Sequence, residues 1–167
     1  QGKHYQFSNL SMDPKPVQPS GPPVVFGAVT PAGARRAIRC ADGLYPLFLD
    51  PTARPDRYLN LQDEIRREAE RIGKSTEGFH MLCAASGRLT DTAQPTGQAR
   101  SICTGSVDQV LEDLAGFADN GYSLVVLALD CPSKTRAEFI EQIERFGQEV
   151  IPEASRLTPS GEWQPVD

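Results

Sequence analysis

Residues 24–31 run Val24-Val25-Phe26-Gly27-Ala28-Val29-Thr30-Pro31, and this stretch contains the signals that decide the fold. Its first five residues form a short β-branched and aromatic run, which is typical of a buried strand in a parallel sheet. Thr30 suits the N-cap of a helix, and Pro31 suits the first helical position. The stretch therefore predicts a strand that passes through a short turn into a helix.

Three further strand-then-helix units come after this one. Apolar runs predict strands at 24–28, 44–49, 79–85 and 124–129, and amphipathic spacing predicts helices at 31–41, 58–72, 106–121 and 134–150. We expect the last helix to turn Ile140, Ile143, Phe146 or Gly147, and Val150 inward and to stop at Pro152. Residues 86–100 are expected to form a long polar loop, of the kind that is often functional or mobile. Because hairpin turns are lacking, the strands should be parallel with right-handed crossovers.

Two architectures fit four consecutive β-α units in an α/β protein. One is an open doubly wound sheet. The other is half of a TIM (β/α)8 barrel, since a whole barrel needs about 250 residues and this chain has 167. We expect three segments: an extended proline-rich arm over residues 1–23, β-α units over 24–152, and a loose tail over 153–167. The chain begins with Gln1 rather than Met, and we expect a fragment of a longer protein.

The bulk composition excludes several classes of function. A net charge of −5 provides no basic face for nucleic acid. No run approaches the roughly 18 apolar residues of a membrane helix, and we see no secretory leader. The four cysteines lie in no CxxC motif and have no histidine at ligand spacing, so we expect no metal site. Their placement suits reduced thiols, and we expect a cytoplasmic protein.

The best candidate site is the turn after the first strand, because ligands of parallel α/β proteins bind at the carboxyl ends of strands. Gly27 and the small Ala28 allow a ligand to approach the backbone, and Val29 and Thr30 lead into a helix N-terminus that favours anions. A plain capped turn would look the same. Arg88 suits either an anion contact or an exposed loop position, and His80 is more typical of a structural histidine. We identify no acid, base or nucleophile.

Several stretches together resemble the C-terminal half of luciferase-like oxidoreductases, which use FMN or the deazaflavin coenzyme F420. They are Pro14 to Gln18 with Pro22 to Gly27, Thr30-Pro31-Ala32 with Arg35-Arg36-Ala37, Ala41-Asp42-Gly43, Gly105-Ser106, Asn120-Gly121-Tyr122, and Phe146 to Pro152. This resemblance implies a TIM (β/α)8 barrel of which the chain is the C-terminal half. It also implies that Gly27, Ala28, Val29 and Thr30 bind the cofactor. The family has a second glycine where this chain has Ala28.

The resemblance implies hydride transfer or monooxygenation of a small-molecule substrate, with F420 favoured over FMN. It leaves the catalytic residues unassigned, because the N-terminal half supplies much of the pocket. The chain should pair with that missing half or form a homo-oligomer. Two alternatives remain: a non-catalytic half-barrel module that self-associates, and an open-sheet enzyme whose strand order reverses at residues 24–28.

Overall fold

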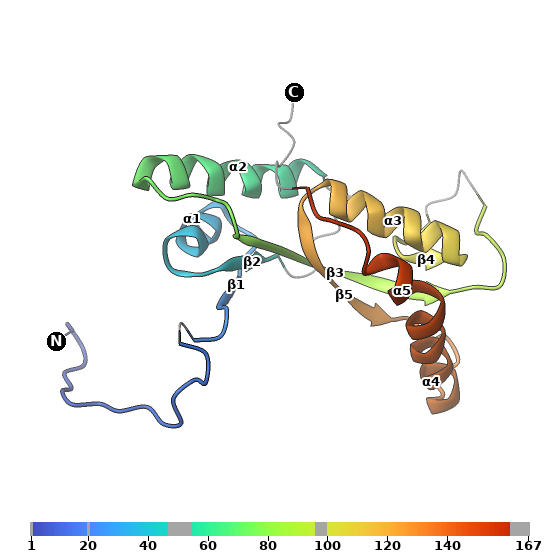
Figure 1. The fold of residues 1–167 in the computed structure, drawn as a ribbon, viewed down its shortest axis with the longest axis horizontal. Coiled ribbons are helices and arrows are strands. Elements are labelled where there is room, and N and C mark those ends of the chain that lie inside the picture. The colour runs from blue at the N-terminus through green and yellow to red at the C-terminus, as the bar shows by residue number, and fades with distance from the viewer. Residues whose placement is uncertain (1, 20, 47–54, 96–99, 161–167) are drawn as a thin grey trace.

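The computed structural model describes residues 2–19, 21–46, 55–95 and 100–160. In chain order the elements are β1 (Val25–Gly27), α1 (Pro31–Cys40), β2 (Gly43–Tyr45), α2 (Pro55–Ile72), β3 (His80–Leu89), β4 (Thr104–Gly105), α3 (Val107–Asp119), β5 (Tyr122–Leu129), α4 (Arg136–Arg145), the π-helical turn η1 (Phe146–Val150) and α5 (Ile151–Ala154). Strands and helices alternate as predicted, except that the two-residue strand β4 follows β3 and that α4, η1 and α5 follow one another (Figure 1).

All strand pairs are parallel, and the main strands follow one another in chain order. β1 pairs with β2, β2 with the start of β3, and β5 runs beside β3, while β4 pairs with the last two residues of β3. The order does not reverse at β1, which removes the support that an open-sheet enzyme with a switch point there would need. Sequential parallel strands are the arrangement found in a (β/α)8 barrel.

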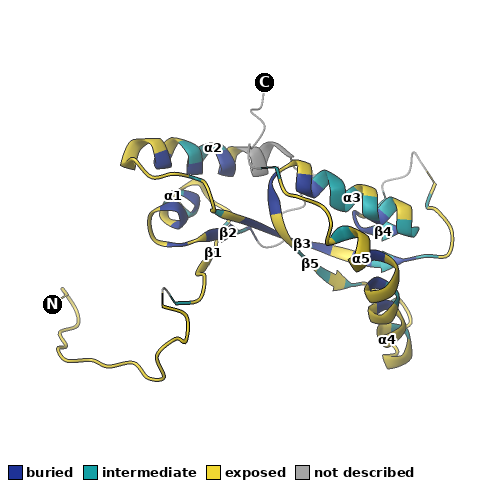
Figure 2. Cartoon of the chain, viewed as in Figure 1, coloured by how far each residue is buried: buried dark blue, intermediate teal, exposed yellow. Residues whose placement is uncertain are grey.

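The core lies between the sheet and the helices. Phe26, Leu44, Met81 and Tyr122 are in register across four strands, so they face the same side of the sheet. Leu44 and Met81 on that side are fully buried, together with Ile38 of α1 and Ile65 of α2. This side of the sheet is therefore the helix-facing side, and Figure 2 shows buried residues concentrated where strands and helices meet.

The opposite side of the sheet, here called the inner face, has no helix cover in the described residues. Leu82 and Ala84 of β3 are in register with Leu124 and Val126 of β5. Leu124 and Val126 are 51% and 43% exposed. Val24 and Val25 are exposed as well, so the prediction that the first strand is buried was wrong. β1 pairs only with β2 among the described strands, and a sheet edge leaves its side chains open on one flank.

The C-terminal helix also differs from the prediction. Ile140 and Ile143 were expected to point inward, but they are 41% and 49% exposed, whereas Gln142 is buried. Phe146 and Val150 are buried as predicted. Helical structure does not stop at Pro152, because that proline lies in the first turn of α5. A missing amide hydrogen costs nothing in the first turn of a helix.

The predicted loop 86–100 is shorter than expected, because β3 continues to Leu89. Part of the segment between β3 and β4 is tied down. The side-chain Oε1 of Gln109 accepts from the Gln94 backbone N at 2.8 Å, and its Nε2 donates to the Gln94 carbonyl at 3.0 Å. Residues 96–99, and residues 47–49 of the predicted second strand, lie outside the described residues.

Candidate functional site

The turn after β1 has the local structure that its residues predict. The Thr30 Oγ1 accepts a hydrogen bond from the Gly33 backbone N at 3.2 Å, and Pro31 begins α1. The Val29 and Thr30 amides have no acceptor within the described part of the chain. The turn therefore presents backbone N–H groups beside the positive end of the α1 dipole, which is an arrangement that favours an anion.

Gly27 and Ala28 have different surroundings, and the difference explains how alanine is tolerated. A Cβ at Gly27 would meet no atom within 4 Å, so the backbone there borders open space. A Cβ at Gly33 would lie 2.4 Å from the Ala28 Cβ. The Ala28 methyl therefore occupies room that Gly33 leaves free in α1. Its side chain packs toward the helix, and the close approach of a ligand at Gly27 remains open.

The turn borders a hollow of about 390 Å³, lined by Phe26 to Thr30, Ala32, Gly33 and Arg36. The Arg36 guanidinium lies 5.9 Å from the centre of the Phe26 ring, within the range of a cation–π contact. Arg35, in contrast, pairs with Glu64 of α2. Of the two adjacent arginines, Arg36 is thus the one that adds positive charge to the hollow.

The other sequence candidates lie elsewhere. His80 is exposed at the start of β3, and its Nδ1 lies 3.3 Å from the Ser123 Oγ, which fits the structural role predicted for it. Arg88 lies within β3 rather than in a loop, and it is half-buried. The four cysteines are free. No cluster of three or more metal-ligating side chains occurs among the described residues, and no described helix is long and apolar enough to cross a membrane.

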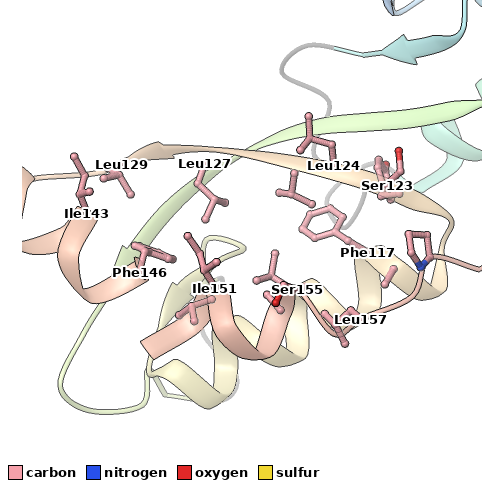
Figure 3. A pocket seen from close by; sticks show the side chains of 17 residues that line it. Phe117, Ser123, Leu124, Leu127, Leu129, Ile143, Phe146, Ile151, Ser155 and Leu157 are labelled. Atoms are coloured by element: carbon pink, nitrogen blue, oxygen red, sulfur yellow. The ribbon is translucent and has the colours of Figure 1, made fainter. Parts of the chain in front are cut away.

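A second hollow, which composition and spacing did not predict, lies on the helix-facing side of β5 (Figure 3). It measures about 540 Å³ and is lined mainly by apolar side chains of β5, α3, η1 and α5, including Phe117, Leu127, Phe146 and Ile151. Phe117 and Tyr122 meet edge-to-face at 5.2 Å between ring centres. None of the described residues that line it is charged, so they provide no charged group that could pair with an anion.

Parallel strands in chain order, with an anion-type turn at the carboxyl end of β1, place the chain among barrel-type α/β proteins. A family model described as luciferase-like monooxygenase matches residues 1–95. The chain belongs to the luciferase-like monooxygenase family, which confirms the resemblance. No curated protein matches it.

Solved structures support the same fold. The coenzyme F420-dependent tetrahydromethanopterin reductase of Methanopyrus kandleri is similar with a TM-score of 0.67 at 17% identity, covering 91% of this chain and 56% of that chain. The monooxygenase RslO1 of Streptomyces bottropensis is similar with a TM-score of 0.67 at 19% identity, covering 91% and 54%. This chain therefore spans about half the length of either structure.

Proposed function

We propose that this chain is the C-terminal half of a luciferase-like oxidoreductase that uses F420 or FMN to transfer hydride to, or oxygenate, a small-molecule substrate. The observation that carries the proposal is the turn from Gly27 to Thr30. In a chain of this family, it combines open space at the backbone, unused amides and a helix N-terminus at the carboxyl end of a strand.

Each residue of the turn has a distinct part in holding the cofactor. The Val29 and Thr30 amides donate to a phosphate, and Thr30 also fixes the first turn of α1 through Gly33. Gly27 lets the ring system or phosphate approach the backbone, while Ala28 packs against the helix. Arg36 adds a positive charge to the same hollow. The bound cofactor supplies the redox chemistry, and these residues bind and orient it.

The exposed inner face supports a partner that completes the barrel. Leu124 and Val126 lie open on β5, and β1 and β5 each pair on one side in the described structure. Unpaired strand edges and an apolar sheet face favour association with another chain segment. The N-terminal half of the longer protein fits both features. A non-catalytic module that self-associates is the second candidate, because a second copy would cover the same edges.

Native mass spectrometry of the chain, alone and with its N-terminal half, tests these proposals with F420 and FMN added in turn. We expect a two-part complex that retains one cofactor. Gly27→Val should abolish cofactor retention without unfolding, because a Cβ at this position meets no protein atom within 4 Å but the side chain occupies the approach to the backbone. Gly116→Ala, at another open glycine in α3, is the matched control.

Two outcomes overturn the enzyme proposal. One is a complex that binds neither cofactor, and the other is a Gly27→Val variant that binds as well as the unaltered chain. A stable homodimer that binds neither cofactor, with or without the N-terminal half, would favour the assembly module.

A further inference from the structure

Arg88 lies on the inner face of the sheet near the carboxyl end of β3. A Cβ at Gly87 would come within 3.2 Å of the Leu127 Cβ and 3.3 Å of Phe146, so Gly87 faces the helices. Leu89 is buried on that same side. Because side chains alternate along a strand, Arg88 points to the opposite side, as does Ser86, which is paired with Ala128 of β5.

Three separate segments of the chain form hydrogen bonds with the backbone around Arg88. Its own N donates to the Cys103 carbonyl at 3.0 Å, and the Asp130 N donates to the Gly87 carbonyl at 3.0 Å. The buried Gln142 side chain of α4 bonds to both backbone groups of Leu89, at 2.8 and 3.2 Å. Burying an amide side chain is costly unless its bonds are made. This strand end is therefore rigidly built, as a residue that binds a ligand requires.

The charge of Arg88 has no partner in the described structure. Eight other arginines pair with a carboxylate there: Arg35, Arg39, Arg66, Arg67, Arg71, Arg100, Arg145 and Arg156. Arg88 makes no such pair although it is half-buried. Burial raises the pKa of the nearby Cys131 thiol, helped by Glu138 and Asp130, and Arg88 opposes this rise in pKa. A half-buried cation that forms no ion pair among the described residues is suited to receive an anionic ligand.

The register separates Arg88 from the turn after β1. Gly27 pairs with Tyr45, and Leu44 pairs with Met81, so Gly27 is level with Leu82. Arg88 lies six residues further along β3, or roughly 20 Å at the usual rise of a strand. A phosphate group that lies beside Gly27 cannot also contact Arg88. An anion at Arg88 must therefore belong to a different part of the ligand, or to a different molecule.

We propose that Arg88 is a second anion-recognition residue, which binds a phosphate or carboxylate group of the substrate or of the far end of the cofactor. The inference rests on the proposed function, in which ligands occupy the inner face at the carboxyl ends of the strands. The planar guanidinium matches either oxyanion with two parallel hydrogen bonds. Arg88 thereby selects for anionic ligands on a sheet face whose other described residues are mostly apolar.

The side-chain Nε–H resonance of Arg88, measured by ¹⁵N NMR on the full chain, reports directly on this contact. Arg88→Met assigns the signal, and Arg136, which pairs with no carboxylate among the described residues, is the internal control. We expect inorganic phosphate and succinate to shift the Arg88 signal but not that of Arg136. Arg88→Lys should weaken the binding of either probe at this position by about tenfold, because an ammonium group cannot make the two parallel hydrogen bonds of the guanidinium.

Two flavins identify the source of the anion. If FMN shifts the Arg88 signal and riboflavin, which lacks the phosphate, does not, the group belongs to the cofactor. If phosphate and succinate shift it while bound FMN leaves it unmoved, the group belongs to the substrate. Equal shifts at Arg88 and Arg136, or none with any probe, overturn the proposal. Failure of the proposed function is a separate result, since it is the absence of both F420 and FMN binding while the phosphate shift at Arg88 persists.

Discussion

Two regions of the molecule bury their helices in different ways. In the first region, α1 and α2 cover the start of the sheet with mainly apolar side chains, although α2 also buries Gln62 and Glu68. Ion pairs join the two helices. Arg35 pairs with Glu64, Arg39 pairs with Glu68, and the Lys74 Nζ donates to the Ile38 carbonyl at 2.8 Å. In this layer the apolar side chains pack against the sheet, and charged side chains of α1 form ion pairs with those of α2.

In the second region, α4 leaves its apolar side chains largely exposed. Phe139, Ile140 and Ile143 are all more than two-fifths exposed, and the residue that α4 buries is the polar Gln142. β5 beside it exposes Leu124 and Val126. The contrast shows that the apolar surface of the first region is covered within the chain, whereas the second region exposes apolar surface that a further segment could cover.

The largest expected effect comes from the same substitution made in each region. Ile38→Ala removes a fully buried side chain of α1 and should lower the free energy of unfolding by about 2–5 kcal/mol. Ile143→Ala removes a side chain that is 49% exposed and should cost less than about 1 kcal/mol in the isolated chain. Urea denaturation followed by circular dichroism measures both.

The comparison sharpens when the N-terminal half is present. Ile143→Ala should then weaken association of the two halves, whereas Ile38→Ala should act mainly on folding. Equal losses of stability for both variants in the isolated chain would show that α4 is as fully packed as α1.

A smaller effect is expected from Gln142→Met, which keeps the shape of the side chain but removes its two bonds to Leu89. Leaving both backbone groups of Leu89 buried and unpaired should cost about 1–3 kcal/mol. Hydrogen exchange at the Leu89 amide should be faster in this variant than in the unaltered chain. Gln148→Met, on the exposed side of the same segment, is the control. Unchanged exchange at Leu89 would mean that Gln142 does not hold the end of β3.

The sequence predicted the first region well because local signals decide it. Thr30 caps α1 and Ser106 caps α3 with a full capping box, as the residue types indicate. The buried residues of α1, namely Ala34, Ala37 and Ile38, are the stripe that the periodicity predicts. The strand-to-helix turn at residues 27–30 was found by the same local rules.

The second region was predicted less well because its packing depends on distant backbone groups and on surface that no described residue covers. Gln142 is buried because it forms hydrogen bonds with the backbone N–H and C=O of Leu89. The pattern of hydrophobic residues in α4 alone cannot predict this contact with a distant strand. The end of β3 was placed at Ala85, so Arg88 was assigned to a loop. A two-residue alternation was the signal missed: Ala85, Gly87 and Leu89 are small or apolar, while Ser86 and Arg88 are polar.

The smallest expected effect concerns the ion pairs of the first region and depends on pH. Hydrogen bonds from Arg71 and Arg39 lower the pKa of Glu68 from 4.5 to about 2. Both arginines are more than half exposed, so solvent weakens the pairs. Because the pKa is lower in the folded state, the stabilisation is complete above about pH 5 and is lost as the pH falls from 4.5 toward 2.

Glu68→Gln isolates this contribution when the free energy of unfolding is measured from pH 7 to pH 2. The difference between the unaltered chain and the variant should be constant above about pH 5 and should shrink below it. Glu77→Gln, at an exposed position outside these ion pairs, should show no such trend. The loss caused by Gln142→Met should be the same at each pH, because an amide does not titrate. Lowering the pH should therefore reduce the loss of unfolding free energy caused by Glu68→Gln in the first region. It should leave the loss caused by Gln142→Met in the second region unchanged. If both costs were independent of pH, charge pairing would not be what distinguishes the α1–α2 layer from α4.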